Sequence, residues 1–327
     1  MLFRSSKYTQ LGLNTEAYGN ILANATHVLH AAWPVDFNLA LSSFSSSLQG
    51  TSNLISLCAK SANRARLIFI SSVSSTMGLD VSPVPEEIIS SPASAAPTGY
   101  AESKWIAEQL CQHAATELNV PCTVLRLGQI AGAVGSSGSW NPADWMPALV
   151  MSSAYLGTLP DQLSDAAAIR WLPIDVIANV IVELSLGRTS EAGAPLQVYQ
   201  PLNPRAVNWS DLSGSVADCI EEYQSAKRLR KGVELVEPSE WLRLLRESAS
   251  EGGHTEADID NLLDVNPALK LQGHFEARYA DVATNGSGLN WSSDKALQRS
   301  KRLRDCKEIT VEDMQRWVAG WLAKSKP

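Results

Sequence analysis

The residues best suited to acid–base chemistry are Tyr100 and Lys104, in the stretch TGYAESKWIAEQL (98–110). A spacing of four residues places both side chains on one face of a helix, roughly 5–6 Å apart at Cβ. A nearby ammonium favours the phenolate, so Lys104 is expected to lower the pKa of Tyr100 from its usual value of about 10. A proton donor works best when its pKa lies near the operating pH. The spacing alone also fits an exposed tyrosine and a solvated lysine.

A serine lies where a further group of the same site is expected. The apolar run RLIFISS (66–72) predicts a β-strand that ends at Ser71 and Ser72. A hydroxyl at the end of a parallel strand reaches the crevice in which open α/β sheets bind ligands, and it could bond to a substrate carbonyl there. The order is a strand-end serine, a long loop, and then a helix opened by Tyr100 and Lys104. This order is more specific than the tyrosine–lysine spacing.

The elements that must position these groups alternate between strands and helices. Strands are expected at 26–32, 66–72 and 121–130, and helices at 41–62 and 99–118. Alternation of this kind predicts parallel strands joined by right-handed crossovers, with helices on both faces. The expected fold class is therefore α/β, with a Rossmann-like parallel sheet.

The pattern changes after about residue 190. A proline-rich stretch at 200–211 leads into mainly helical patterns, which a polar stretch at 248–260 interrupts. We therefore expect a Rossmann-like domain over 1–194 and a smaller, mostly helical C-terminal lobe over 195–327, on the substrate side.

Composition and charge argue against several classes of protein. The chain has 327 residues, 45% of them hydrophobic and 19% charged, as in an ordinary globular protein. Its net charge of -7 argues against nucleic acid as a partner, because a phosphate-binding surface needs a basic excess. No apolar run is long enough for a signal peptide or a membrane span. Five scattered cysteines without a CxxC spacing indicate reduced thiols of a cytoplasmic protein, with no metal site.

Six blocks of the chain resemble the thioester reductase domains of the extended short-chain dehydrogenase/reductase superfamily. Such domains end fungal nonribosomal-peptide-synthetase-like enzymes and carboxylic acid reductases. The blocks cover nearly the whole chain, and the Trp-Pro-Val-Asp-Phe and Trp-Leu-Pro-Ile-Asp sequences within them are the most specific. They are THVLHAAWPVDFN (26–38), QGTSNLISLC (49–58), GYAESKWIAEQL (99–110), VLRLGQIAG (124–132), WNPADWMPALVMSSAYLGTLPD (140–161) and RWLPIDVIANVIVEL (170–184).

The resemblance implies an NADPH-dependent reduction in secondary-metabolite biosynthesis. In the family, hydride from NADPH reduces an acyl thioester held by an acyl carrier (thiolation) protein, which releases an aldehyde or, after a second reduction, an alcohol. By position, Tyr100 would be the proton donor, and Lys104 would hold the nicotinamide ribose and lower the tyrosine pKa. Ser72 would polarise the substrate carbonyl.

The resemblance also implies which residues contact the cofactor and the substrate. Beside Lys104, the expected cofactor contacts are His30, Ala31, Ala32, Arg126 and Gln129. With Ser72, the residues expected to line the substrate site are Trp33, Trp140 and Trp145. Packing inside the protein is the alternative interpretation of Trp140 and Trp145.

Two features depart from the family's pattern. The family's Rossmann unit opens with a strand, a Gly-x-x-Gly-x-x-Gly turn and a helix, and the turn lets the backbone approach the pyrophosphate. No such turn precedes the strand at 26–32, so the N-terminal strands of the sheet are expected to be incomplete. The second departure is Ala31, which stands where the family usually has asparagine.

Three hypotheses about function therefore stay open. The first is the NADPH-dependent reductase of carrier-bound acyl thioesters. The second is a truncated, non-catalytic relative that binds a carrier protein or a metabolite without a dinucleotide. The third is a ketoreductase or epimerase that acts on a free small molecule. A further possibility is that Met1 is an internal start in a longer reading frame. The missing strands would then leave an unpaired sheet edge unless a partner chain covers it.

Overall fold

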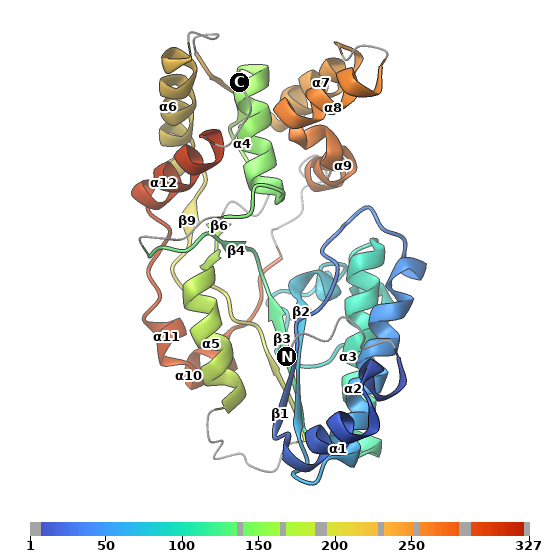
Figure 1. Ribbon diagram of the computed structural model, residues 1–327. Coiled ribbons are helices and arrows are strands. Elements are labelled where there is room, and N and C mark those ends of the chain that lie inside the picture. Colours follow the sequence, from blue (N-terminus) through green and yellow to red (C-terminus); the bar gives the residue numbers. More distant parts are fainter. Residues whose placement is uncertain are drawn as a thin grey trace. The chain divides into compact units, whose positions relative to one another are not determined.

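The computed structural model describes seven stretches of the chain (Figure 1): 8–135, 140–163, 168–186, 195–227, 232–251, 255–280 and 289–323. Contacts divide the chain into two compact units, each built from three segments. Unit 1 comprises Met1–Gly128, Ile177–Leu202 and Leu289–Asp305, and unit 2 comprises Gln129–Val176, Asn203–Gly288 and Cys306–Pro327. The boundary expected between residues 194 and 195 lies within the second segment of unit 1.

Unit 1 is built on a parallel sheet with the strand order β1-β2-β3-β8. The strands are β1 (His27–His30), β2 (Arg66–Ser72), β3 (Cys122–Leu127) and β8 (Leu196–Tyr199). In the register, Val124 of β3 lies between Phe69 of β2 and Val198 of β8. Every residue of β3 is buried, as expected of a parallel strand with both faces covered. The predicted α/β class with a parallel sheet is confirmed.

Helices cover both faces of this sheet (Figure 1). One side carries α1 (Thr15–Asn24), α2 (Ser45–Lys60) and α3 (Gly99–Glu117), and the other carries α5 (Ile174–Leu186), α10 (Asp294–Arg299) and α11 (Lys301–Arg304). Short 3-10 helices connect these elements: η1 (Thr9–Gly12), η2 (Leu41–Phe44), η3 (Val73–Thr76) and η4 (Pro92–Ser94).

The start of α3 is fixed by two neighbouring residues. The side chain of Thr98 caps the helix, because its hydroxyl accepts a hydrogen bond from the backbone N–H of Ala101 at 3.2 Å. Gly99 follows, and a Cβ there would collide with the backbone of residues 39–41. The first turn of α3 is therefore held closely against the segment that enters η2.

The strand β1 forms one edge of the sheet. No described strand pairs with its free side, and Leu29 remains 56% exposed. Edge strands present unpaired N–H and C=O groups that can pair with another chain. Among the described residues, the expectation of an incomplete N-terminal side of the sheet is confirmed.

Unit 2 is mainly helical and contains three two-stranded pairings. Its helices are α4 (Trp145–Leu156), α6 (Ser210–Ala226), α7 (Pro238–Ser248), η5 (Ala249–Glu251), α8 (Glu256–Val265), η6 (Pro267–Leu271), α9 (Gln272–Ala280) and α12 (Val311–Leu322). Its paired strands are β4 (Ile130–Ala131) with β7 (Leu172–Pro173), β5 (Thr158–Pro160) with β10 (Glu234–Val236), and β6 (Ala168–Ile169) with β9 (Val207–Asn208). Its core is rich in tryptophan, with Trp140 in ring contact with Trp171, Trp317 and Trp321.

Two further observations concern the described residues. None of their helices is long and apolar enough to cross a bilayer, and no cluster of His, Cys, Asp and Glu side chains among them is suited to hold a metal ion. All five cysteines are free thiols, and four of them are buried.

Candidate active site

The three residues predicted to do the chemistry meet at the carboxyl end of β2. Tyr100 and Lys104 lie in the first two turns of α3, and Ser72 is the last residue of β2. The side chains of Tyr100 and Ser72 are hydrogen-bonded. The Nζ atom of Lys104 donates a hydrogen bond to the carbonyl oxygen of Ile70 at 2.7 Å. The helix that opens with the tyrosine is thus tied to the end of β2 at two points.

Aromatic rings surround the Tyr100 side chain, which is 8% exposed. The edge-on rings of Phe37 and Phe44 have centroids 5.3 and 6.3 Å from that of Tyr100. Burial raises the pKa of Tyr100, and the hydrogen bond with Ser72 only partly opposes this. The expectation that Lys104 would lower this pKa is therefore wrong, because burial dominates. The phenol keeps its proton at neutral pH, and this is the form that a proton donor needs.

Lys104 is more buried than an ordinary lysine, with 3% of its surface exposed. Its Nζ atom lies 4.5 Å from the ring centroid of Trp33, 4.9 Å from that of Phe69 and 5.6 Å from that of Tyr100. Burial lowers the pKa of Lys104 to about 7, although the nearby carboxylate of Glu108 acts in the opposite direction. The amine can therefore exchange its proton near neutral pH, and the rings stabilise its charged form.

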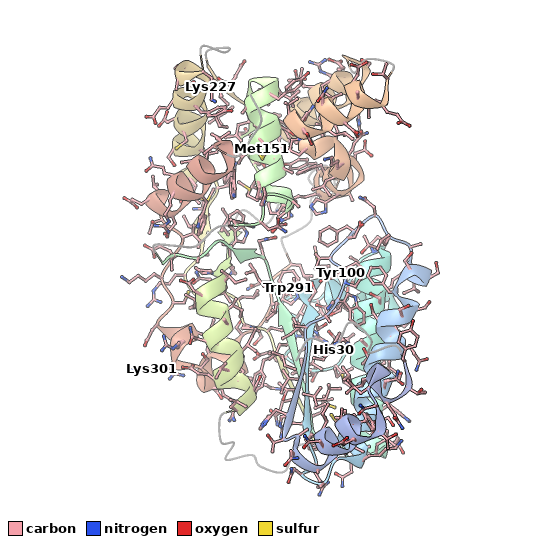
Figure 2. The ribbon with its side chains drawn as sticks, viewed as in Figure 1. His30, Tyr100, Met151, Lys227, Trp291 and Lys301 are labelled. Atoms are coloured by element: carbon pink, nitrogen blue, oxygen red, sulfur yellow. The ribbon has the colours of Figure 1, made fainter. Side chains whose placement is uncertain are left out.

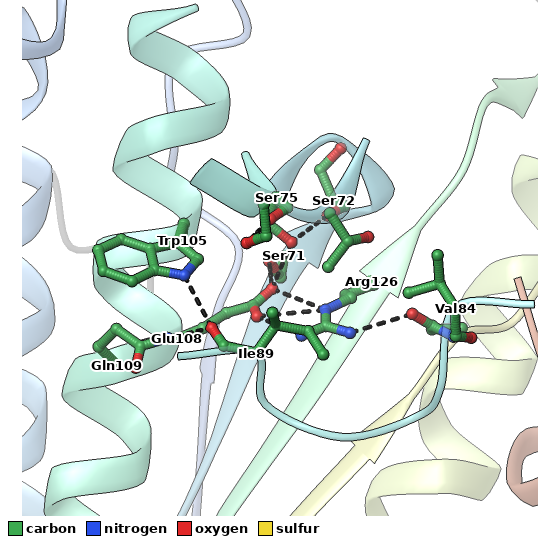
Figure 3. A network of polar contacts seen from close by, with 12 residues as sticks. Ser71, Ser72, Ser75, Val84, Ile89, Trp105, Glu108, Gln109 and Arg126 are labelled. Atoms are coloured by element: carbon green, nitrogen blue, oxygen red, sulfur yellow. Dashed lines mark hydrogen bonds and ion pairs between the residues drawn. The ribbon is translucent and has the colours of Figure 1, made fainter. Parts of the chain in front are cut away.

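Below this site lies a buried ion pair between Glu108 of α3 and Arg126 of β3 (Figure 3). The Nη2 atom of Arg126 is 2.7 Å from Oε2 of Glu108, and neither side chain is exposed. The hydroxyls of Ser71 and Ser75 donate to Oε1 of the same carboxylate at 2.5 and 2.8 Å. We did not predict Glu108 from the sequence. The repeated spacing of four residues could have indicated Glu108, because Tyr100, Lys104 and Glu108 lie along one face of α3.

Arg126, expected to contact the cofactor, has its described partners inside unit 1. Its Nε donates to Glu108, and its Nη1 atom donates to Oε1 of Gln200 at 3.1 Å and to the carbonyl oxygen of Pro85 at 3.4 Å. No part of the residue is exposed. Arg126 thus connects α3 to the end of β8.

The other predicted site residues of unit 1 lie at the end of β1 or just after it. His30 is the last residue of β1 (Figure 2). Its ring is buried, and its Nε2 atom lies 3.1 Å from Oγ1 of Thr51. Burial and the charge of Lys104 lower the pKa of His30 to about 4, so the ring is neutral at physiological pH. Ala31 and Ala32 are exposed. Trp33 is half-buried and donates from Nε1 to the hydroxyl of Ser103 at 3.2 Å.

The remaining predicted residues, Gln129, Trp140 and Trp145, meet within unit 2 around Asp144. The Nε1 atom of Trp140 and the Nε2 atom of Gln129 donate to Oδ2 of Asp144 at 2.9 and 3.0 Å. Trp145 donates from Nε1 to Oε1 of Gln129 at 2.5 Å. Both tryptophans are 4% exposed and belong to the core of unit 2. This geometry favours the alternative interpretation of the two rings as packing residues. Asp144 was not predicted as their common partner.

The side chains of unit 1 fit one end of a dinucleotide better than the other. A phenol, an ammonium and a serine hydroxyl meet at a strand end, where they suit a nicotinamide ribose and a carbonyl oxygen. The pyrophosphate of a dinucleotide needs a tight turn of backbone N–H groups before a helix. Between residue 8 and β1 the chain forms η1 and α1, without a Gly-x-x-Gly-x-x-Gly turn.

One known protein family matches more than half of the chain. The NAD-binding family described as "Male sterility protein" matches residues 6–181. The chain belongs to this family. The expected resemblance to reductase domains of the extended short-chain dehydrogenase/reductase type is confirmed, and a nicotinamide dinucleotide is the cofactor class of this NAD-binding family.

Relatives of this male sterility family member include fungal reductases. The chain is 35% identical to adenylate-forming reductase Nps9 of Serpula lacrymans var. lacrymans (strain S7.9), over 96% of its own length and 28% of that protein. It is 31% identical to a carboxylic acid reductase of Neurospora crassa, over 95% of its length and again 28% of the relative. The chain therefore spans less than a third of either protein.

A solved structure shares the fold of this family member. It is the terminal R domain from the myxalamid PKS-NRPS biosynthetic pathway, with a TM-score of 0.70 and 21% sequence identity. The match covers 96% of this chain and 72% of the other.

Proposed function

We propose that the protein is a reductase of acyl thioesters, uses NADPH, and receives its acyl group from a carrier protein in secondary-metabolite biosynthesis. The observation that carries this proposal is the meeting of Ser72, Tyr100 and Lys104 at the end of β2. Membership of an NAD-binding family and relatives named as reductases support it.

The three side chains have separate tasks in the proposed reaction. NADPH, when bound, supplies the hydride that adds to the thioester carbonyl carbon. The Ser72 hydroxyl donates a hydrogen bond to the carbonyl oxygen, and the Tyr100 phenol transfers its proton to that oxygen. The resulting hemithioacetal loses the carrier's thiol and leaves an aldehyde. The ammonium of Lys104 stabilises the phenolate that forms at Tyr100.

The other expected contacts extend the same proposal. His30 at the end of β1 and Ala31 and Ala32 after it would lie along the cofactor, and the cofactor role expected of Gln129 stays a prediction. Trp33 would face the substrate side near Lys104, whereas Trp140 and Trp145 pack in the core of unit 2. Arg126 would act through Glu108, since its described partners are internal. A partner chain would cover the free edge of β1.

Replacing Tyr100 by Phe tests the proposal. The variant keeps the ring and its contacts with Phe37 and Phe44 but has no phenol proton. We expect NADPH oxidation with an acyl thioester to fall at least about 100-fold. The matched control is Tyr8→Phe, which changes a 55% exposed tyrosine of unit 1 and should leave the rate unchanged.

Two measurements distinguish this function from the two alternatives, a non-catalytic binding protein and a ketoreductase or epimerase. NADPH binding, followed by fluorescence titration, should be micromolar in the wild type and in Tyr100→Phe. Absence of binding would overturn the reductase proposal in favour of a non-catalytic relative that binds a carrier protein or a metabolite. Faster turnover of a free ketone than of a carrier-bound thioester would instead favour a ketoreductase. Undiminished thioester reduction by Tyr100→Phe would disprove the role of the tyrosine.

A further inference from the structure

The carboxylate of Glu108 is the centre of a network of hydrogen bonds and an ion pair in unit 1 (Figure 3). It is fully buried, and its two oxygens accept hydrogen bonds from Arg126, Ser71 and Ser75. A charge buried without partners would be costly, and these donors offset that cost.

The partners of Glu108 flank the predicted carbonyl-polarising residue on both sides. Ser71 precedes Ser72 in β2, and Ser75 lies in η3, whose first turn begins at Ser72. The Ser75 hydroxyl lies 2.8 Å from both the Ser72 carbonyl oxygen and Glu108 Oε1. It has a single proton to donate, and the carboxylate is the stronger acceptor. Glu108 therefore holds the turn that carries the Ser72 hydroxyl.

Three consecutive residues at the end of β2 each contact one residue on a single face of α3. The carbonyl of Ile70 accepts from Lys104, the hydroxyl of Ser71 donates to Glu108, and the side chain of Ser72 bonds to Tyr100. Three consecutive strand residues thus meet three helix residues spaced by four. A shift of the helix along the strand would break all three contacts together.

We propose that Glu108 is a positioning residue for the reduction: anchored by Arg126, its carboxylate holds Ser71 and Ser75 and so fixes the turn that carries the Ser72 hydroxyl. Because Glu108 lies one helical turn from Lys104, the same carboxylate also favours the charged form of that amine. This inference rests on the proposed function for its catalytic consequence, whereas its effects on the Ser72 turn and on the charge of Lys104 do not depend on that function. Glu108 acts through its neighbours.

The charge on Lys104 depends on the titratable and charged groups that face it. Glu108 and Tyr100 lie on its own helix, one turn to either side, and His30 faces it from β1. Arg126 of β3 faces Glu108 and is paired with it. Of these, the Glu108 carboxylate raises the Lys104 pKa against the effect of burial. His30 is neutral at physiological pH, and Tyr100 keeps its proton. Glu108 is therefore the negative charge that favours the protonated form of Lys104.

The test measures the protonation of Lys104 directly and through catalysis. In Glu108→Gln the Lys104 pKa, followed by NMR of the carbon bonded to Nζ and assigned with Lys104→Met, should fall below its wild-type value of about 7. The alkaline limb of kcat/KM should move to lower pH by about one unit. Glu183→Gln is the matched control, because Glu183 of α5 also accepts from a serine hydroxyl, that of Ser300, and contacts none of these groups.

Glu108→Gln leaves the Arg126 charge buried without its partner, which can prevent folding. In that case the double variant Glu108→Gln/Arg126→Met, which removes both charges, gives the test, and the Lys104 pKa should again be lower than in the wild type. An unchanged Lys104 pKa in whichever variant folds would overturn the inference. A lowered pKa in a protein that reduces no thioester would support the inference and refute the proposed function.

Discussion

At the scale of single residues, Lys104 is an amine with only 3% of its surface exposed. In the unfolded chain this lysine titrates at its ordinary pKa near 10.5, and in the folded protein at about 7. Between these two values the unfolded state binds the extra proton. Folding stability therefore rises as the pH increases through this window, and the cost of burying the ammonium is greatest below pH 7.

Replacing Lys104 by Met should therefore stabilise the protein in acid. At pH 6 we expect a larger free energy of unfolding for Lys104→Met than for the wild type, by an amount on the order of a few kcal/mol. The difference should shrink as the pH approaches 10, because the wild-type amine then folds uncharged. Urea denaturation at several pH values measures this difference. A gap that does not change with pH would contradict the assignment of the lysine as a buried base.

Sequence reasoning found the residues of this site more readily than their electrostatics. A strand-end serine, a spacing of four and the resemblance to reductase domains together predicted Ser72, Tyr100 and Lys104 as neighbours. The direction of the Tyr100 pKa could not be predicted in the same way, because the rings that bury it, Phe37 and Phe44, come from a distant part of the chain. The same limit applied to Glu108, whose partners lie on β2, η3 and β3.

At the scale of elements, the beginning of α3 decides where the phenol lies. Gly99 immediately precedes Tyr100 and packs against the backbone of residues 39–41. Any Cβ at this position must push the helix away from that segment. The same segment leads into η2, which carries Phe44 beside the Tyr100 ring.

Gly99→Ala should therefore destabilise the protein and reduce catalysis together. We expect a loss of about 1–3 kcal/mol in the free energy of unfolding, from overpacking against rigid backbone. The matched control is Gly19→Ala in α1, where an added Cβ meets nothing within 4 Å. That variant should gain roughly 0.5–1 kcal/mol from helix propensity. Equal effects of the two substitutions in urea denaturation would rule out the packing argument.

At the scale of the whole molecule, the chain leaves unit 1 and returns to it twice. The last return, Leu289–Asp305, is held by Glu86, whose carboxylate accepts hydrogen bonds from the backbone N–H groups of Lys295 and Ala296. Val84 pairs with Trp291 in the same region. Contacts between residues so far apart in the sequence produce no local sequence pattern from which they could be predicted. The alternation of strands and helices could therefore predict the sheet but not which later segments complete its unit.

The free edge of β1 leads to a prediction about self-association. Leu29 is 56% exposed on this strand, and a lysine there should oppose pairing with another chain. We expect the wild type to self-associate in a concentration-dependent way, measured by light scattering, and Leu29→Lys to abolish this association. Val182→Lys in α5, at a position 54% exposed in the same unit, is the control and should change nothing. A wild type that stays monomeric at every concentration would refute this prediction.

The indole of Trp33 gives the lysine site an optical property. The ring centroid lies 4.5 Å from Nζ of Lys104, so gain or loss of the ammonium proton changes the electric field across a fluorophore. The emission of Trp33, isolated as the difference between the wild type and Trp33→Phe, should follow the titration of Lys104 in real time. The protein thus contains its own spectroscopic indicator for the amine that we place beside the reacting phenol.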